Sequence, residues 1–486
     1  MAYRDLREFV AALRRRGLLH EVSARVDPEL EISAITDRVV KAGGPALLFR
    51  EVAGSSMPVL INAFGSYERM CLALGVSSLD EIGERISKLL SLKMPGTFSG
   101  KLRELGKLRE LAALPTKLVG GRPPCQEVVV RGDEVDLGEI PILKCWPKDA
   151  GRFVTLPLVI TKHPETGERN VGMYRLQVFD RNTLGMHWQI HKDGAEHYRH
   201  AEKTGARLPV AVAIGADPVL TYAATAPLPG IDEFVFAGFL RRDRVELTSA
   251  LSVPLEVPAH AEIVLEGYVD PGERRVEGPF GDHTGHYTPP EPFPVFHVET
   301  ITRRRDPIYH ATVVGIPPME DCFLGKATER IFLPLLRMQI PEIVDIDLPF
   351  EGVFHNCVLV SIDKRFPMQA RKVMHALWGL GMLSLSKAIV VVDSGVDVHD
   401  HSAVAFHALS NIDPRRDLVI SEGPVDHLDH SAPQQFYGSK VGIDATAKWP
   451  SEGHDRPWPE LVAMDPAVTQ RVAERWAELG IEGILP

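Results

Sequence analysis

Apolar runs of strand length, separated by turn residues, dominate the middle of the chain. "EVVV", "FVTLPLVITK", "NVGMYRLQVFD" and "LGMHWQIH" are divided by "HPETGER" and "DRNT", and further runs follow at "AEIVLEGYVD" and "PVFHVETITRR". Runs of this composition bounded by Gly, Pro, Asn and Asp favour strands joined by turns. Strands packed so densely along the chain predict an antiparallel sheet or barrel between about Cys125 and Ile316.

In the last third of the sequence, strand-like and helix-like segments alternate. A helix-like stretch at Leu324–Met338 is followed by "CVLVSI", "PMQARKVMHALWG", "AIVVVD", "HSAVAFHAL" and "LVIS", in which strand-like and helix-like runs alternate. This alternation predicts a mostly parallel sheet covered by helices.

The first block, to about Leu92, mixes helices with short apolar strands such as "ALLF" and "PVLINAF". Four apolar residues near its start have the i, i+3, i+4, i+7 spacing of an amphipathic helix, which Gly17 should end: Leu6, Phe9, Val10 and Leu13. Charges interrupt this stretch throughout, so we do not expect a secretory signal.

Composition narrows the class of protein. The chain has 486 residues, of which 44% are hydrophobic and 24% charged, as in a globular protein of several domains. Its net charge of −11 argues against a nucleic-acid partner. Five scattered cysteines without a CxxC pair favour the reducing cytoplasm. The near-repeat "KLRELGKLREL" at Lys101–Leu111 is interpreted as a connecting helix, with peripheral membrane association as the alternative.

The segment "RRVEGPFGDHTGHYTPP", Arg274–Pro290, holds four ionisable side chains within ten residues: Glu277, Asp282, His283 and His286. Its prolines and glycines exclude a helix, so it is predicted to be a loop of fixed shape. The loop could bind a metal ion in a hydrolase, use two carboxylates for acid–base chemistry, or be held by its own hydrogen bonds. A functional loop is favoured, because so many polar groups on a stiff turn need partners.

An arginine within an apolar strand also needs a partner. If "ERNVGMYRLQVFD" forms one strand, Arg175 points the same way as Val171 and Met173, toward the core. Burial of an unpaired guanidinium is prohibitive, so a carboxylate or another anion should pair with it.

Several histidines invite a metal interpretation. In "GMHWQIHK", His187, Gln189 and His191 would share one face of a strand. "DVHDHSAVAFH" is better explained by Asp400 or Ser402 capping a helix, with solvated histidines beside it. "DHLDH" at Asp426–His430 lies in a polar loop. Neither of these two clusters has the i, i+4 histidine pair of a zinc helix, so both are predicted to be structural.

Together these segments resemble one known family. "NVGMYR", "GMHWQIHKDG", "AIGADP", "LPGIDEFVFAG", "VPAHAEIVLEGYV", "EGPFGDHTGHY" and "GSKVGIDATAKWP" are similar to the UbiD family, decarboxylases that use prenylated FMN. The resemblance runs in the family's order to about Pro450. It implies an α/β plus β architecture: an N-terminal α/β domain with the connecting helix (1–115), a split β-barrel that binds prenylated FMN (116–316) and a C-terminal α/β domain for oligomerisation (317–486).

The same resemblance implies a cofactor site. Asn170, His187 and Glu233 match the family's ligands of a divalent ion, typically manganese, which bridges to the flavin phosphate, and imidazole and oxygen ligands suit that ion. Potassium is a second candidate ion. His187 departs from the arginine that members of the ubiquinone branch can have there, which argues against that substrate. The residues expected to contact the flavin or its ion are Asn170, Met173, Tyr174, Arg175, His187, Trp188, Gln189, Glu233 and Lys387.

The resemblance also implies three catalytic residues. Arg175 matches the family's arginine, Glu277 its first loop carboxylate and Asp282 its proton donor. We expect Glu277 to pair with Arg175 while Asp282 stays free to exchange a proton with substrate, and His283 and His286 to brace the loop.

The activity implied is reversible, non-oxidative decarboxylation of an aromatic or α,β-unsaturated carboxylic acid, with CO₂ as the other product and a flavin prenyltransferase as the cofactor supplier. A cytoplasmic homodimer or homohexamer is expected. Two alternatives stay open: a metal-dependent hydrolase built on Asp282, His283 and His286, and a non-catalytic flavin-binding protein.

Overall fold

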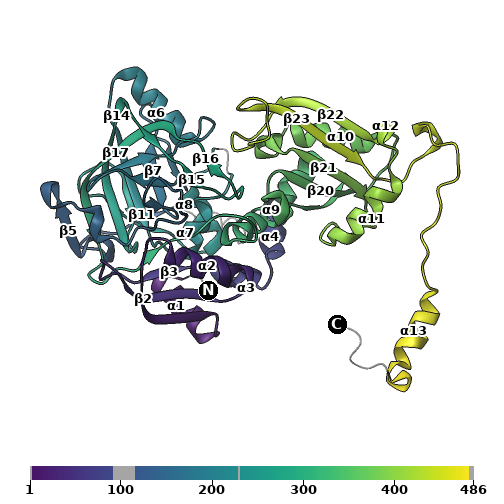
Figure 1. Ribbon diagram of the computed structural model, residues 1–486, viewed down its shortest axis with the longest axis horizontal. Coiled ribbons are helices and arrows are strands. Elements are labelled where there is room, and N and C mark those ends of the chain that lie inside the picture. Colours follow the sequence, from purple (N-terminus) through teal and green to yellow (C-terminus); the bar gives the residue numbers. More distant parts are fainter. Residues whose placement is uncertain (1–2, 91–114, 228–229, 481–486) are drawn as a thin grey trace, which may run out of the picture.

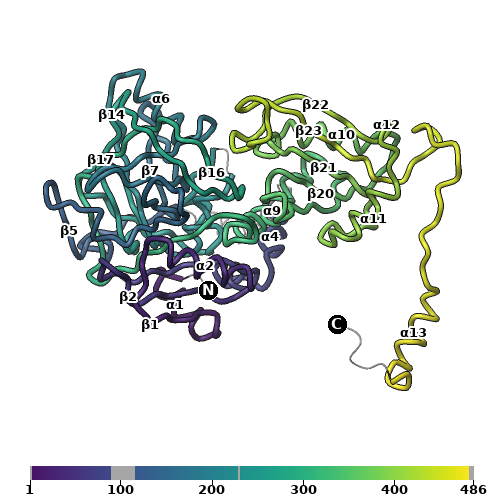
Figure 2. The backbone as a smooth tube through the Cα atoms, viewed as in Figure 1, coloured from purple at the N-terminus to yellow at the C-terminus, as the bar shows by residue number. Residues whose placement is uncertain are grey.

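The computed structural model describes residues 3–90, 115–227 and 230–480 (Figure 1). Its backbone forms two bodies joined along helix α9 (Glu320–Gln339): the N-terminal and middle domains together, and the C-terminal domain beside them (Figure 2). In the part of the chain so described, no helix has the length and apolarity needed to cross a membrane. The near-repeat at Lys101–Leu111 lies outside the described residues.

The N-terminal domain has a four-stranded sheet with helices around it. Its elements are α1 (Leu6–Arg15), β1 (Leu19–Val26), α2 (Glu31–Lys41), β2 (Ala46–Val52), β3 (Val59–Ile61), α3 (Tyr67–Leu74) and α4 (Asp80–Leu90). The sheet order is β1-β2-β3-β18, and β18 (Tyr309–His310) comes from far along the chain. The predicted first helix is confirmed, since its four spaced apolar residues are all buried and Gly17 follows with a φ of 71°.

The middle domain is built on a nine-stranded sheet in which every pairing is antiparallel, as predicted. The strand order is β6-β9-β10-β17-β14-β11-β7-β8, with β5 also paired to β17. The strands are β5 (Val128–Arg131), β6 (Phe153–Val154), β7 (Leu158–Lys162), β8 (Arg169–Gly172), β9 (Leu176–Val178), β10 (Thr183–Met186), β11 (Leu208–Ile214), β14 (Ile263–Glu277) and β17 (Glu291–Arg303). Smaller elements accompany the sheet: α6 (Asp193–Thr204), α7 (Pro218–Ala223), α8 (Glu233–Arg241), and the strands β4 (Lys117–Leu118), β12 (Glu246–Ser249) and β13 (Glu256–Pro258).

Two strand predictions in this domain are wrong. The chain leaves the sheet after Gly172 and re-enters it at Leu176, so Arg175 lies in a connection and not within a strand. The Tyr174 ring folds back over Gly172, where a Cβ would lie 2.3 Å from ring atoms, so a residue with a side chain could not allow this turn. Strand β10 ends at Met186, and therefore His187 starts a loop.

The C-terminal domain has a five-stranded sheet of order β19-β20-β21-β23-β22. Its elements are β19 (Ile343–Asp347), β20 (Cys357–Ile362), α10 (Gln369–Trp378), β21 (Ala388–Asp393), α11 (His401–Asn411), α12 (Pro414–Asp417), β22 (Leu418–Pro424) and β23 (Tyr437–Asp444). The predicted parallel sheet holds only at the centre, where β20, β21 and β23 run parallel. Both edge strands are antiparallel, because β19–β20 and β22–β23 are joined without the crossover helix that parallel neighbours need. Beyond this sheet the chain extends away from the body to α13 (Pro466–Glu474), which has no buried residue (Figure 1).

Candidate active site

Arg175 lies at the centre of a buried charge cluster in the middle domain. Its Nε and Nη2 donate to the two carboxylate oxygens of Glu277, over 2.8 and 3.1 Å, and its Nη1 donates to Asp282 Oδ2 over 2.6 Å. Nη2 also reaches Thr288 Oγ1 at 3.2 Å, and the guanidinium lies 4.6 Å from the centre of the Phe280 ring. Glu277 is fully buried and the two other side chains are 9% exposed. The sequence-based expectation of a buried arginine paired with a carboxylate is therefore confirmed.

The loop that carries Asp282 is fixed to the sheet beneath it. It forms the tip of the β14–β17 hairpin and contains two short paired strands, β15 (Phe280–Gly281) and β16 (Tyr287–Thr288). Gly281 N donates to Asp149 Oδ1 and Gly278 N to Gln177 Oε1, both over 2.7 Å. A Cβ on Gly281 would lie 2.3 Å from the Trp146 ring, so only glycine fits there. The predicted fixed shape of the loop thus comes from Asp149, Gln177 and Trp146.

Asp282 has more partners than the sequence predicts, and it is not free. Besides Arg175, it accepts hydrogen bonds at Oδ1 from the backbone N and the ring Nδ1 of His283, each over 2.7 Å. Burial opposes its ionisation, but the His283 charge and the Arg175 guanidinium outweigh burial and hold the pKa of Asp282 below its usual range. Glu277 is likewise held as a carboxylate, with a pKa lowered to about 2 against burial by His187 and Arg175. The expectation of a free Asp282 fails because one guanidinium can bind two carboxylates, and the loop brings both within its reach.

Residues of the C-terminal domain complete the surroundings of this loop. The His283 Nε2 atom lies 2.9 Å from His355 Nε2, and the His286 ring lies 3.9 Å from the His430 ring. Because these two loop histidines contact the other domain, the expectation that they only brace their own loop is too narrow.

The residues expected to bind the metal ion form a neighbouring group. Asn170 lies on β8 and donates to the Tyr174 hydroxyl over 3.4 Å. Glu233 is the first residue of α8, and its Oε2 accepts from Val171 N over 2.9 Å. Burial, with help from Asp232 and Asp193, raises the pKa of Glu233 to about 7. The structure therefore brings Asn170 and Glu233 together on adjacent elements.

His187, the third expected ligand, directly follows strand β10. Its Nδ1 lies 3.2 Å from Glu277 Oε2, and its Nε2 is buried without a hydrogen-bond partner. Burial and the nearby Arg175 charge lower the pKa of His187, so the ring is neutral. Within the described part of the chain, no hydrogen bond or ion pair joins His187 to Asn170 or Glu233. An orphaned imidazole nitrogen and a buried carboxyl without a cation nevertheless fit a divalent ion, which takes such ligands.

The residues expected to contact the flavin surround these groups. Tyr174 and Trp188 are buried, and the Trp188 indole nitrogen has no hydrogen-bond partner. The Met173 backbone N is bonded to Ala224 O over 3.0 Å. Gln189 Nε2 lies 3.4 Å from His427 Nε2 of the C-terminal domain. Unpartnered buried donors of this kind fit a polar ligand such as a phosphate.

Lys387 makes no hydrogen bond or ion pair with the other expected site residues, all of which lie in the described ranges. Its Nζ donates to Asp429 Oδ1 over 2.9 Å and to the Ser431 hydroxyl. It therefore binds the loop Asp426–His430, which itself reaches the middle domain through His427 and His430. The loop was predicted to be structural, and these contacts place it between the two domains.

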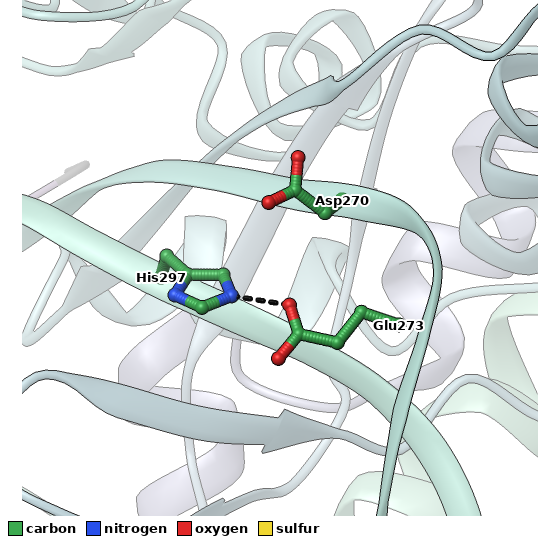
Figure 3. A group of neighbouring side chains, drawn as sticks. All are labelled: Asp270, Glu273 and His297. Carbon is green, nitrogen blue, oxygen red and sulfur yellow. Dashed lines mark hydrogen bonds and ion pairs between the residues drawn. The ribbon is translucent and has the colours of Figure 1, made fainter.

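In two other clusters that resemble metal sites, protein side chains already bond to the carboxylates. In the first, Asp270, Glu273 and His297 lie together on the β14–β17 ribbon (Figure 3), but His297 Nε2 pairs with Glu273 and Arg207 Nε with Asp270. In the second, Glu329, Asp347 and His399 surround Lys326, which bonds to both carboxylates.

Two histidines of the "DVHDH" segment, His399 and His401, contact Asp347 of that second cluster. Asp400 caps α11 as predicted, accepting from Ala403 N over 2.9 Å. His399 and His401 are exposed, as predicted, and both also hydrogen-bond to Asp347 over 2.9 Å.

Sequence reasoning missed several residues of the site: Asp149, Thr288, Asp321, His355 and His427. Asp149 occurs in no motif, and His355 lies in a short loop between β19 and β20. Asp321 is a buried carboxyl near Asp282 and His283, and burial raises its pKa to about 7. Thr288, within the Arg274–Pro290 segment, and His427, within "DHLDH", carried a signal that could have been used.

The chain has three domains of mixed α/β and β structure, and the buried arginine–carboxylate cluster lies in the middle one. Family models for the N-terminal, Rift-related and C-terminal domains of 3-octaprenyl-4-hydroxybenzoate carboxy-lyase match residues 10–86, 117–317 and 322–445. The chain therefore belongs to the UbiD family, as the resemblance implied.

Individual relatives are similar to this chain over nearly its whole length. The chain is 58% identical over 483 residues to an uncharacterized protein of Archaeoglobus fulgidus, a match that covers 99% of both. Vanillic acid decarboxylase of Sedimentibacter hydroxybenzoicus, in closed form, superposes with a TM-score of 0.85 at 29% identity over 99% of each chain, and its open form with 0.81 at 28% over the same share. HmfF, a UbiD-class enzyme of Pelotomaculum thermopropionicum solved with FMN, gives 0.79 at 30% over 96% of this chain and 98% of its own, and an evolved dimeric form of it was solved with prFMN.

Proposed function

We propose that this protein catalyses the reversible, non-oxidative decarboxylation of an aromatic or α,β-unsaturated carboxylic acid with prenylated FMN and a divalent metal ion. The observation that carries the proposal is Arg175, buried between Glu277 and Asp282 in a chain of the UbiD family. Solved relatives include decarboxylases of vanillic acid and of 3,4-dihydroxybenzoic acid, both aromatic acids.

The cofactor residues support this proposal. Asn170, His187 and Glu233 would hold manganese, with potassium as a second candidate ion, and Trp188 and Gln189 would face the flavin. Prenylated FMN, when bound, supplies an electron sink for the loss of CO₂. The orphaned nitrogens of His187 and Trp188 are the groups such a ligand would satisfy. Lys387 could contribute only if the loop at Asp429 released it.

The Arg175 cluster is the part of the chain suited to handling the proton. Two carboxylates, Glu277 and Asp282, are matched there by Arg175 and a protonated His283, so the cluster is close to neutral. Movement of a proton from His283 to Asp282 changes no net charge within the buried site. Asp282 would then protonate the carbon that has lost CO₂, as a general acid does.

The other expectations follow the family assignment. A flavin prenyltransferase would supply the cofactor in the cytoplasm. A homodimer or homohexamer would form through the C-terminal domain, which exposes large apolar side chains at Phe406, Leu409 and Ile420. Such exposed groups favour contact with a second copy.

The alternative of a metal-dependent hydrolase has little support. His283 has both ring nitrogens within hydrogen-bond distance of other side chains, Asp282 and His355, so neither is open to an ion. A non-catalytic flavin-binding protein would not need a proton-handling cluster of this kind.

The test is co-expression with a flavin prenyltransferase, followed by an absorbance spectrum and a CO₂-release screen that includes vanillic, 3,4-dihydroxybenzoic and cinnamic acids. We expect a bound prenylated flavin and release of CO₂ from at least one acid. Asp282→Asn should retain the flavin and lose about 10²–10⁴-fold in rate, the usual contribution of general acid catalysis. A flavin-loaded protein that releases CO₂ from none of a broad panel of acids would overturn the proposal.

A further inference from the structure

A pair of histidines connects the proton-handling cluster to the other domain. His283 lies on the middle-domain loop, and His355 follows the short helix Phe350–Gly352 in the connection between β19 and β20. Their Nε2 atoms are 2.9 Å apart, and the two rings are steeply inclined, with an interplanar angle of 63°. The other His283 nitrogen, Nδ1, lies 2.7 Å from Asp282 Oδ1. Asp282, His283 and His355 therefore form one continuous chain of hydrogen bonds across the domain boundary.

Two patterns of protons satisfy both bonds: an imidazolium His283 that donates to His355, or a neutral His283 that accepts from it. Two imidazole nitrogens can share a hydrogen bond only if one donates and the other accepts. His283 faces a carboxylate at Nδ1, so it donates there, and as an imidazolium it also donates from Nε2. His355 then accepts at Nε2 as a neutral ring, with its own proton on the buried Nδ1, which has no other partner.

The charges around the pair favour the pattern with an imidazolium His283. His283 is surrounded by Asp282, Asp321 and Asp426, and their attraction outweighs burial and raises its pKa. His355 faces His283, Asp426, Asp282 and Lys192, and burial together with the His283 charge lowers its pKa to about 4. The Phe354 ring stacks on His283 at 5.4 Å and fixes its plane.

We infer that His355 is a positioning residue for proton delivery: it holds His283 as the donor that supplies Asp282, so that the C-terminal domain completes the proton-handling site of the middle domain. This inference rests on the proposed decarboxylase function for its purpose, but the hydrogen-bonded state of the two histidines can be measured without it.

Each proton in this transfer has a defined source and destination. The His283 Nδ1 proton moves to Asp282 Oδ1, which leaves a neutral His283 whose remaining proton, on Nε2, is still donated to His355. Asp282 gives the proton to the product carbon, forms the new C–H bond and returns to a carboxylate. His283 regains a proton at Nδ1 from solvent water. In the direction of carboxylation each transfer is reversed.

The first experiment measures the pKa of His283 in the full-length protein, from the pH dependence of deuterium exchange at its ring C2–H followed by mass spectrometry. His355→Phe keeps a ring but removes the acceptor, so the pKa of His283 should fall by about one unit, the worth of one such hydrogen bond. His355→Gln keeps an acceptor at a similar reach and should restore much of the shift. His286→Gln is the control, because His286 lies on the same loop and bonds to Asp282 only through its backbone oxygen, so this variant should leave the pKa of His283 unchanged.

The second experiment follows decarboxylation of whichever acid of the panel is turned over. In His355→Phe we expect kcat to fall about tenfold at pH 7 with little change in KM, equivalent to one lost interaction in the proton-transfer step. The alkaline limb of the pH–rate profile should move to lower pH by the same unit as the pKa of His283, which a purely structural defect would not cause.

The outcomes distinguish the role of His355 from the proposed function. An unchanged pKa of His283 in His355→Phe, or a fall in rate with an unmoved pH profile, would overturn the role of His355. A shifted pKa of His283 in a protein that decarboxylates nothing would support the histidine pair and overturn the proposed function instead.

Discussion

Two groups of buried polar side chains in the middle domain differ in how many hydrogen-bond partners they have. The complete region is Arg175 with Glu277 and Asp282, and the incomplete region is Glu233 with the neighbouring His187 and Trp188. At Arg175, every carboxylate oxygen of Glu277 and Asp282 has a partner from the protein itself. At Glu233 a buried carboxyl has its pKa raised to about 7, and in the neighbouring group His187 Nε2 and Trp188 Nε1 have no partner. Natural proteins rarely leave buried polar groups unpaired, so we propose that the groups around Glu233 and His187 bind a ligand that is not protein, whereas the carboxylates around Arg175 are bonded to the polypeptide itself.

The largest loss of stability should come from removing the Arg175 guanidinium from the complete region. Arg175→Met would leave two buried carboxylates without their shared cation, and we expect a loss of about 3–5 kcal/mol in unfolding free energy, measured by urea denaturation. Arg275→Met removes an exposed arginine paired with Asp180 at 3.1 Å and should cost less than about 1 kcal/mol. Equal losses in the two variants would contradict the view of Arg175 as the cation that the cluster requires.

A substitution at Glu233, in the incomplete region, should raise the unfolding free energy instead of lowering it. Because burial raises the pKa of Glu233 from 4.5 to about 7, its stabilising contribution is full below pH 4.5 and is lost as pH rises through 7. Glu233→Gln removes that loss, so without metal the variant should be more stable than the wild type at pH 8, by up to about 3 kcal/mol. Manganese should stabilise the wild type and not the variant. Identical stability profiles between pH 5 and 8, read by urea denaturation, would remove Glu233 from the ion site.

The packing of the Asp282 loop should be sensitive to a single methyl group. Gly281→Ala brings a Cβ to 2.3 Å from the Trp146 ring, and overpacking of this kind costs about 1–3 kcal/mol. Gly423→Ala, where a Cβ would meet nothing within 4 Å, should change thermal stability by less than about 0.5 kcal/mol. If Gly281→Ala proves as stable as Gly423→Ala, the loop is not held as tightly as its contacts indicate.

The smallest change in stability is expected at Trp188. Trp188→Phe removes a buried N–H that has no partner, so unfolding free energy should change by less than about 1 kcal/mol, while FMN affinity, measured by fluorescence quenching, should fall about tenfold. Trp146→Phe is the matched control, because the Trp146 Nε1 donates to Val314 O over 2.8 Å. That variant should lose stability, and an unchanged FMN affinity in Trp188→Phe would show that its indole nitrogen does not face the ligand.

The cluster of Arg175, Glu277 and Asp282 is easier to predict from sequence than the region around Glu233. A guanidinium among apolar residues demands an anion, and the family motif around Glu277 indicates which one, although the strand assumed at Arg175 does not exist. The second bond, to Asp282, depends on the path of the loop, which the spacing of residues does not determine.

The histidine contacts between the middle and C-terminal domains were not predicted from the sequence. His283 and His355 are 72 residues apart and meet only because two separately folded sheets pack together. The same holds for His427 against Gln189, since the histidine comes from a polar loop without helical or strand periodicity. The antiparallel edges of the C-terminal sheet were missed for a simpler reason, because hydrophobic runs do not tell a hairpin from a crossover.

Strand β18 has a consequence for the order in which the protein can be made. Tyr309 and His310 pair with Val59 and Leu60 and are almost fully buried, so the last strand of the N-terminal sheet leaves the ribosome about 250 residues after its neighbour. Until then β3 has an unpaired edge of backbone amides and carbonyls, the kind of edge that recruits other chains. A nascent chain that stalls before residue 309 would therefore depend on chaperones, and its N-terminal domain expressed alone should aggregate.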